Sequence, residues 1–201
     1  MEELIQHPIT HNIGLGSVNI NDPRVKNREM RWHVLFDIIE KEKYENIVEV
    51  GSQEGRTPWY ILKNSTRESV NVSIVDPYLY YDGYGYKEPF SMTDVEKQAR
   101  KYLNEFVESN RCHFYKDYSI NTAKEFKDES LDLVFIDANH TYKYVKEDIE
   151  SWYPKIKKGG MLAGHDWCDG FPGVEQAAKE YFQPLNKDIK LAHNTVWLVK
   201  K

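Results

Sequence analysis

Short runs of apolar and β-branched residues recur along the chain and alternate with segments of helical periodicity. Five of these runs end at a polar or glycine position: Asn46–Val50, Val70–Val75, Cys112–Tyr115, Leu131–Ile136 and Gly160–Ala163. Most of them are rich in Val and Ile, as is typical of strands that are covered on both faces. They therefore predict the strands of a buried, parallel sheet.

Apolar residues at helical spacing fill most of the gaps between these runs. The predicted helices are marked by a capping residue, a capping box or a nearby proline. We expect them at about 29–41, from Thr57-Pro58 onward, from the capping box at 93–96, before Pro154 and after Pro172. Alternation of strand and helix is the order expected of a parallel sheet with right-handed crossovers.

The last two strand-like segments have a different connection. Ile189–Ala192 and Thr195–Lys200 are separated only by His193 and Asn194. Two residues can join antiparallel strands but not parallel ones. We therefore expect an α/β fold whose parallel sheet carries an antiparallel hairpin at its C-terminal edge.

Composition and charge exclude several classes of protein. The 201 residues include 27 Lys and Arg against 32 Asp and Glu, a formal charge of −5 without a basic stripe, which counts against nucleic-acid binding. No apolar run approaches the roughly 18–20 residues of a membrane-spanning helix, and the N-terminal sequence lacks the pattern of a secretory signal. Cys112 and Cys168 follow no metal-binding spacing, so we expect a reduced, cytoplasmic protein.

The chain divides into an N-terminal segment with a helix, residues 1–44, and a main domain, residues 45–201. The first segment is expected to cover the substrate side of the site. Within the main domain, residues 77–91 read PYLYYDGYGYKEPFS, a long loop that is dense in aromatic side chains. Loops of this length are usually functional or disordered, and aromatic faces stack on sugars and other rings. We expect a lid or an acceptor pocket, with Tyr78 and Tyr81 as substrate contacts.

An acid lies at or near the end of each of the five predicted parallel strands. Because ligands of open parallel sheets bind beyond the carboxyl ends of the strands, these acids are expected to meet in one site. One acid in a turn would mean little, since Asp is common there, but five are harder to dismiss. They are Glu49, Asp76, Asp117, Asp137 and Asp166.

The loop after the first strand runs from Gly51 through Gly55 into a helix, which suits close approach of a ligand to the backbone. It lacks both the G-x-G-x-x-G spacing of dinucleotide sites and the G-K-[ST] of phosphate-binding loops. Glu49 would repel a phosphate, while Asp76 is placed to accept ribose hydroxyls. S-adenosylmethionine, a nucleoside with cationic groups and no phosphate, fits these features better than NAD or ATP.

Four segments carry a resemblance to a known family: VEVGSQEGRT, SIVDPY, KDYS and LDLVFIDANHTYKYVKEDIESWYPKIKKGGMLAGHDW. They resemble class I S-adenosylmethionine-dependent methyltransferases, and more narrowly the small group that includes sugar and macrolide-sugar O-methyltransferases. The resemblance covers about Glu45 to Phe182 and is most specific from Asp132 to Trp167. It implies a three-layer Rossmann-like sandwich with a mostly parallel, seven-stranded sheet, and it makes residues 45–201 the catalytic domain.

The resemblance also implies which residues bind the cofactor. The first loop would surround its methionine part, residues 117–119 would flank its adenine, and Asp137 would lie beneath the reactive methyl group. The implied set is Glu49, Gly51, Ser52, Gly55, Thr57, Asp76, Asp117, Tyr118, Ser119 and Asp137.

In related metal-dependent enzymes, acids after the fourth and fifth strands hold a divalent cation. The sugar enzymes carry two adjacent acids after the fifth strand, whereas this chain has His165 followed by Asp166. A site of Asp137, His165 and Asp166 would bind Mn²⁺ or softer ions more readily than Mg²⁺. Alternatively, no metal is bound and a histidine acts as general base. The catalytic candidates are His140, His165 and Asp137, with His140 ranked first as base and His165 first as metal ligand.

These features together predict an O-methyltransferase that uses S-adenosylmethionine and a small hydroxylated acceptor such as a sugar. Trp167, close to the ligand edge, is a further candidate for acceptor contact. The alternatives are a catalytically silent, methyltransferase-like binding module and, less favoured, a nucleotide-dependent oxidoreductase. The expected partner is a small molecule, not a nucleic acid or a membrane, and a homodimer is considered.

Overall fold

The computed structural model describes residues 27–28, 30–80 and 91–201. The predictions for residues 1–26, for Tyr81 and for most of the aromatic loop therefore lie outside the described residues. None of the helices in the described ranges is long and apolar enough to cross a membrane.

A seven-stranded sheet forms the middle layer, in the order β3-β2-β1-β4-β5-β7-β6. The five parallel strands are β1 (Asn46–Val50), β2 (Asn71–Val75), β3 (Cys112–Tyr115), β4 (Leu131–Ile136) and β5 (Ile156–Gly164). The last two strands, β6 (Lys190–Leu191) and β7 (Trp197–Lys200), pair antiparallel to each other, and β7 pairs antiparallel to β5. The predicted fold class, a Rossmann-like α/β sandwich with an antiparallel C-terminal hairpin, is confirmed.

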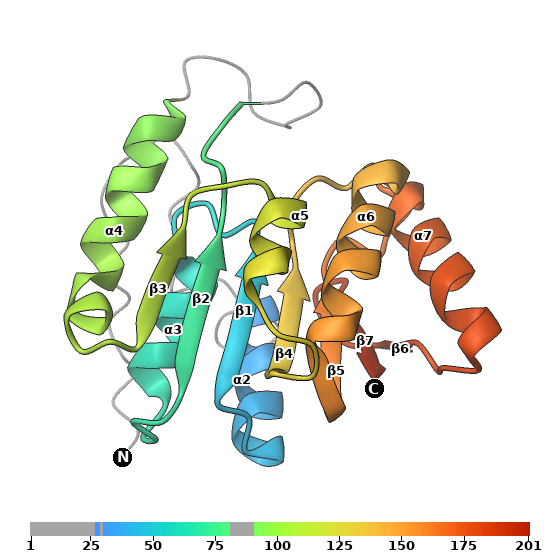
Figure 1. The fold of residues 1–201 in the computed structure, drawn as a ribbon, viewed down its shortest axis with the longest axis horizontal. Coiled ribbons are helices and arrows are strands. Elements are labelled where there is room, and N and C mark those ends of the chain that lie inside the picture. Colours follow the sequence, from blue (N-terminus) through green and yellow to red (C-terminus); the bar gives the residue numbers. More distant parts are fainter. Residues whose placement is uncertain (1–26, 29, 81–90) are drawn as a thin grey trace.

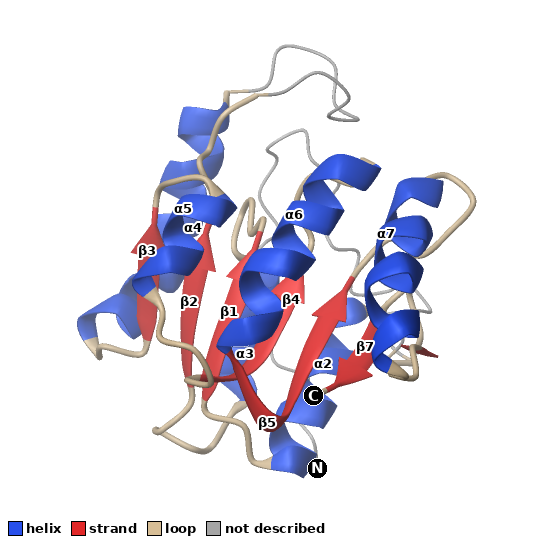
Figure 2. Ribbon diagram, turned by 45° about the vertical axis from the view of Figure 1, so that its right-hand side comes forward, coloured by secondary structure: helices blue, strands red, loops and turns tan. Residues whose placement is uncertain are grey.

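Helices cover both faces of the sheet (Figure 1; Figure 2). One face carries α2 (Arg31–Glu42), α3 (Arg56–Asn64) and α4 (Met92–Glu108). The other face carries α5 (Ser119–Thr122), α6 (Tyr142–Trp152) and α7 (Pro172–Phe182). Short 3-10 turns follow α5, α6 and α7 at Ala123–Glu125, Tyr153–Lys155 and Gln183–Leu185.

Alternate residues of the central strands enter two separate apolar cores. In β4, Leu133 and Phe135 pack with the α2, α3 and α4 layer, whereas Val134 and Ile136 pack with the α6 and α7 layer. Side chains of a strand point to opposite faces in turn, so a strand between two helical layers must be apolar at nearly every position. This explains why continuous Val and Ile runs, rather than alternating patterns, marked the strands.

Two helices begin earlier than their sequence signals predict. The first residue of α3 is Arg56, with Gly55 as N-cap at φ 73°, so Thr57 is a buried residue of the first turn and not the cap. The positive φ favours glycine at position 55, and a Cβ there would also lie 2.6 Å from Leu103 Cδ1, so that this side chain would have to move. The N-cap of α4 is Ser91, whose side chain accepts a hydrogen bond from the backbone N–H of Asp94.

The turn of the C-terminal hairpin is shifted by one residue from the predicted position. Its central residues are Asn194 and Thr195, at φ 54° and 56°, and the N–H of Val196 bonds to the carbonyl of His193 at 3.4 Å. Positive φ at both central residues is the geometry of the tight turns that match the twist of a hairpin. The shift brings Asn194 next to the strand-end residues described below.

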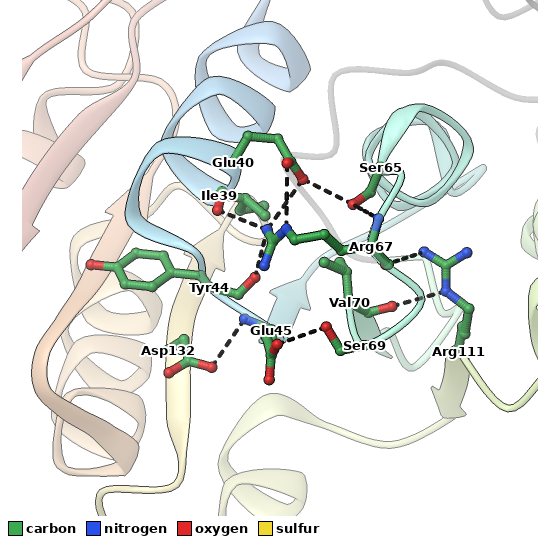
Figure 3. A network of polar contacts seen from close by, with 10 residues as sticks. All are labelled: Ile39, Glu40, Tyr44, Glu45, Ser65, Arg67, Ser69, Val70, Arg111 and Asp132. Carbon is green, nitrogen blue, oxygen red and sulfur yellow. Dashed lines mark hydrogen bonds and ion pairs between the residues drawn. The ribbon is translucent and has the colours of Figure 1, made fainter.

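A polar network ties the helical layer to the amino ends of the strands (Figure 3). The Arg67 guanidinium donates to the carbonyls of Ile39, at 2.9 Å, and Tyr44, at 3.1 Å. The carboxylate of Asp132 accepts the backbone N–H of Asn46 at 2.8 Å and so joins the start of β4 to the start of β1. These contacts fix the end of the sheet that faces away from the acids at the strand ends.

Candidate functional site at the carboxyl ends of the strands

A cavity of about 630 Å³ opens at the carboxyl ends of the parallel strands. Its volume lies within the range of small-molecule binding sites, roughly 300–1,000 Å³. The loops after β1, β2, β3, β4 and β5 contribute to its walls, together with residues of α2 and α6. The predicted site residues on these walls are Gly51, Ser52, Asp76, Tyr118, Ser119, Asp137, His140, His165 and Asp166.

The other described members of the predicted set lie behind the walls or to one side. Glu49 and Thr57 are buried, Gly55 caps α3, and Asp117 accepts the backbone N–H of Tyr118 at 2.6 Å. These four residues support the loops that form the cavity.

Two predicted substrate contacts occupy positions in the packing of the fold. Tyr78 has a φ of 50°, and its buried ring packs with Met92 and Val95 of α4. The ring of Trp167 packs against Trp197, with 6.5 Å between centroids. Neither residue lies on the wall of this cavity, and their role as acceptor contacts stays a prediction.

The loop after β1 lies in close contact with the loop after β4. Gly51 has a φ of 84°, and a Cβ there would lie 2.3 Å from the carbonyl oxygen of Asp137. Backbone bonds hold both loops, from the N–H of Gly51 to Val75 at 2.9 Å and from the N–H of Asp137 to Val50 at 2.8 Å. Glycine is therefore required at position 51 for the two loops to meet.

Two carboxyl groups of this region are buried. Burial raises the pKa of Glu49 to about 8, and the hydroxyl of Ser52 donates a hydrogen bond to it. Burial also raises the pKa of Asp76, although its carboxylate accepts the backbone N–H of Gln53 at 2.9 Å and of Tyr78 at 2.7 Å. These bonds hold the Asp76 carboxylate in place on the cavity wall.

Two acids and two histidines form a cluster on another part of the wall. Nε2 of His140 lies 2.8 Å from Oδ2 of Asp166 and 3.6 Å from Oδ1 of Asp137. Nδ1 of His165 lies 3.2 Å and 3.5 Å from the same two oxygens. Arg31 of α2 completes the cluster, with Nε 3.0 Å from Oδ2 of Asp137.

Mutual attraction shifts the pKa values of the two acids and the two histidines of the cluster. Burial by itself lowers the pKa of the two imidazoles, but the carboxylates of Asp137 and Asp166 outweigh it. The pKa of His140 rises to about 9 and that of His165 to about 10. Against the effect of its burial, Arg31 and both histidines hold the pKa of Asp137 well below its usual range. Both imidazoles are therefore protonated on both nitrogens, and positively charged, at neutral pH in this arrangement.

The same cluster has the donor set of a divalent-metal site. Asp137, His140 and Asp166 each offer one ligand atom, and these atoms lie within 4.8 Å of one another. The sequence placed His165, not His140, beside the two acids, and the structure brings both imidazoles to them. A cation between the carboxylates would compete with the protons of the imidazoles, since metal binding releases protons from its ligands.

Three residues of the site carry no sequence signal. Arg31 comes from α2, in a segment that was expected only to cover the site. Asn194 comes from the hairpin turn, and its Oδ1 lies 2.8 Å from Nε2 of His165. Asp148 comes from the middle of α6 and lines the cavity beside Ser119. Each reaches the site through tertiary packing, and no local motif marks it.

Residues 48–167, more than half of the chain, match a family model described as a methyltransferase domain. Among curated protein sequences, none matches the chain. Three solved structures share its fold. The O-methyltransferase NovP has 16% identity and a TM-score of 0.63, over 89% of this chain and 79% of that one. CalS11, a TDP-rhamnose 3′-O-methyltransferase of calicheamicin biosynthesis, has 11% identity and a TM-score of 0.61, over 94% of this chain and 88% of that one. A methyltransferase from Podospora anserina, bound to S-adenosylhomocysteine, has 13% identity and a TM-score of 0.60, over 90% of this chain and 82% of that one.

Proposed function

Since the chain belongs to the family of methyltransferase domains, we propose that it transfers the methyl group of S-adenosylmethionine to a hydroxyl oxygen of a small acceptor such as a sugar. The observation that carries the proposal is one cavity that holds both Asp76 and the cluster around Asp137 and Asp166. We also propose that residues 45–201 are the catalytic domain and that residues 1–44 cover its substrate side.

The charges of the cavity fit the proposed cofactor. Carboxyl groups of Asp76, Asp137, Asp148 and Asp166 lie on the walls, and Arg31 is paired with one of them. An acidic wall suits the sulfonium and amino groups of S-adenosylmethionine and repels the phosphates of a dinucleotide. This supports methyl transfer over the oxidoreductase alternative.

When bound, S-adenosylmethionine supplies an electrophilic methyl group. The residues of the chain must orient the acceptor hydroxyl toward it and remove the hydroxyl proton. His140 and His165 lie on the cavity wall, where they can serve as the base. Each imidazole can accept a proton only after it has lost the second ring proton, which the neighbouring carboxylates stabilise. Asp137 and Asp166, with His140 or His165, would hold a divalent metal, which when bound lowers the pKa of a coordinated hydroxyl.

Aromatic side chains at the cavity support an acceptor with a ring. Tyr118 and Tyr144 line the cavity and are 56% and 46% exposed, so their faces are open to a ligand. Sugars and phenols both stack on such faces. The sugar is favoured because one structure of similar fold is a TDP-rhamnose O-methyltransferase.

The test is calorimetric titration with S-adenosylmethionine and S-adenosylhomocysteine, with and without Mn²⁺ or Mg²⁺, followed by turnover assays on sugars and small phenols. We expect roughly micromolar binding, or about −8 kcal/mol. Binding without turnover on any acceptor would favour the binding-module alternative. Absence of binding under every condition would refute the proposal.

A further inference from the structure

Arg31 is a charged residue of α2 that reaches the cavity at the carboxyl ends of the strands. It is the first residue of the helix and precedes residues 45–201, the proposed catalytic domain. Its side chain lines the cavity, and its Nε lies 3.0 Å from Oδ2 of Asp137, which directly follows β4. The N-terminal segment therefore contributes a positive charge to a site whose acids belong to the main domain.

The contact between Arg31 and Asp137 is an ion pair that is largely shielded from water. The two side chains are 25% and 12% exposed, so solvent screens their attraction only in part. Nε of Arg31 is buried, yet this atom has no hydrogen-bond partner of good geometry within the described part of the chain. Charge, and not hydrogen-bond geometry, thus holds this nitrogen at the carboxylate, and a different cation can satisfy the same group.

The other oxygen of Asp137 faces the donor set that fits a divalent metal. Oδ1 lies 3.6 Å from Nε2 of His140, which itself lies 2.8 Å from Oδ2 of Asp166. Nε2 of His140 is buried and, like Nε of Arg31, has no well-aligned hydrogen-bond partner in the described ranges. A cation held by these three residues would take the lone pair of this nitrogen once its proton has left, so the residues present fit a metal.

Arg31 and such a cation would share one carboxylate. Asp137 carries a single negative charge when ionised, and the guanidinium beside Oδ2 already balances it. A metal bound through the same carboxylate would gain less attraction from it and would be repelled by the guanidinium, because charges interact strongly where water is largely excluded. The metal affinity of the site is therefore expected to depend on Arg31.

We propose that Arg31 competes with a divalent cation for Asp137, so that helix α2 limits the metal affinity of the site. This inference rests on the metal site of the proposed function and not on the identity of the cofactor or of the acceptor. While Arg31 stays paired with Asp137, a histidine that acts as base without a metal is favoured over metal-assisted transfer. The N-terminal segment thereby takes part in the chemistry of the site, beyond covering its substrate side.

The experiment is a calorimetric titration of the full chain with Mn²⁺ in one buffer. Arg31→Gln removes the positive charge and leaves a polar side chain. We expect this variant to bind Mn²⁺ at least roughly tenfold more tightly than the unaltered protein. Arg31→Lys retains the charge, and since the contact with Asp137 does not depend on aligned hydrogen bonds, this variant should keep the weaker affinity.

The matched control is Arg28→Gln. Arg28 is also paired with an acid, Asp37, at 2.6 Å, but the two side chains are 50% and 59% exposed and lie outside the cavity wall. This variant should bind Mn²⁺ as the unaltered protein does, and a gain equal to that of Arg31→Gln would overturn the inference by reducing it to net charge. Equal or weaker binding by Arg31→Gln would also overturn it, because Arg31 would then support Asp137 as a ligand.

Hydrogen exchange of the unaltered protein keeps the inference testable even if Arg31→Gln fails to fold. A cation that competes for Asp137 loosens the connection of α2 to the site, so amides in the first turns of this helix should exchange faster at saturating Mn²⁺. The N–H of Val34, bonded to the carbonyl of Met30 at 3.3 Å, is among them. Unchanged or slower exchange, measured by mass spectrometry, would contradict competition.

Parallel titrations with S-adenosylhomocysteine separate this inference from the rest of the proposed function. If neither the unaltered protein nor Arg31→Gln binds Mn²⁺, the metal site and this inference are overturned together, while binding of S-adenosylhomocysteine leaves the proposed methyl transfer intact. If the Mn²⁺ results are as expected but S-adenosylhomocysteine does not bind, the proposed cofactor is overturned and the role of Arg31 stands.

Discussion

Glu49 lies buried at the end of β1, and Glu49→Gln separates the effect of its charge from that of its shape. The side chain is 3% exposed, and Ser52 donates a hydrogen bond to it. Gln retains an acceptor for Ser52 and nearly the same volume, but it cannot ionise. The variant therefore tests whether this carboxyl group is neutral in the folded protein.

The size of the pH effect on the free energy of unfolding follows from the pKa values of Glu49 in the folded and the unfolded state. Burial raises the pKa of Glu49 in the folded protein to about 8, against 4.5 for an ordinary glutamate. Between these values the folded state holds a proton that the unfolded state has released. The contribution of Glu49 to the free energy of unfolding is therefore full below the lower value and is lost as the pH rises toward the higher one. One proton corresponds to roughly 1.4 kcal/mol per pH unit, or roughly 3 kcal/mol between about pH 5.5 and about pH 7.5.

The assay is urea unfolding of both proteins at several pH values across this interval, with a chelator present to exclude divalent ions. We expect the free energy of unfolding of the unaltered protein, relative to Glu49→Gln, to fall as the pH rises, because other titrating groups are common to both. Glu125→Gln, a change at an exposed acid, controls for the loss of one charge. A difference between the two proteins that does not vary with pH would refute a neutral, buried Glu49.

Three further predictions concern the site and the sheet. Asp76→Ala should weaken binding of S-adenosylmethionine by more than roughly tenfold, or about 1.4 kcal/mol, and unchanged affinity by calorimetry would rule out the ribose assignment. Asp137→Ala and Asp166→Ala should each abolish metal-dependent turnover without unfolding the protein; activity that survives both changes and a chelator contradicts a metal site. Arg67→Ala removes two bonds to carbonyls and an ion pair, and should lower the free energy of unfolding by about 2 kcal/mol in urea titrations.

The strands were predictable because burial on both faces leaves a strong local signal. A strand between two helical layers needs apolar residues at successive positions, as Leu133 to Ile136 show. The turn of the hairpin was misplaced by one residue because the choice depends on which two residues take positive φ. Asn194 and Thr195 do so here, whereas Asn at the second central position had been expected. Local sequence does not fix that choice when the flanking strands are short.

The acids of the site were predictable from topology, since parallel strands must end at the same edge of the sheet. The contributions of Arg31, Asp148 and Asn194 were not, because each depends on how a helix or hairpin packs against that edge. Tyr78 lies away from the wall of the cavity for a related reason. It lies two positions after Asp76, but its backbone is left-handed and its ring is directed into the α4 packing. A composition rich in tyrosine does not tell which rings are buried.

The hairpin turn makes the two histidines of the cluster unequal. His165 is bound on both sides, with Nε2 at 2.8 Å from Asn194 and Nδ1 facing the two carboxylates. A metal between the acids would displace the Nδ1 proton of His165, and the amide oxygen of Asn194 would keep the proton on Nε2, as in metal ligands whose outer nitrogen is hydrogen-bonded. His140 meets the acids through Nε2 and packs its ring on Phe171, with 4.6 Å between centroids. The ligand atom of His140 lies within 4.8 Å of those of Asp137 and Asp166, so His140 is placed to act as the third ligand of a metal, whereas the bond to Asn194 fixes the ring of His165 beside this group.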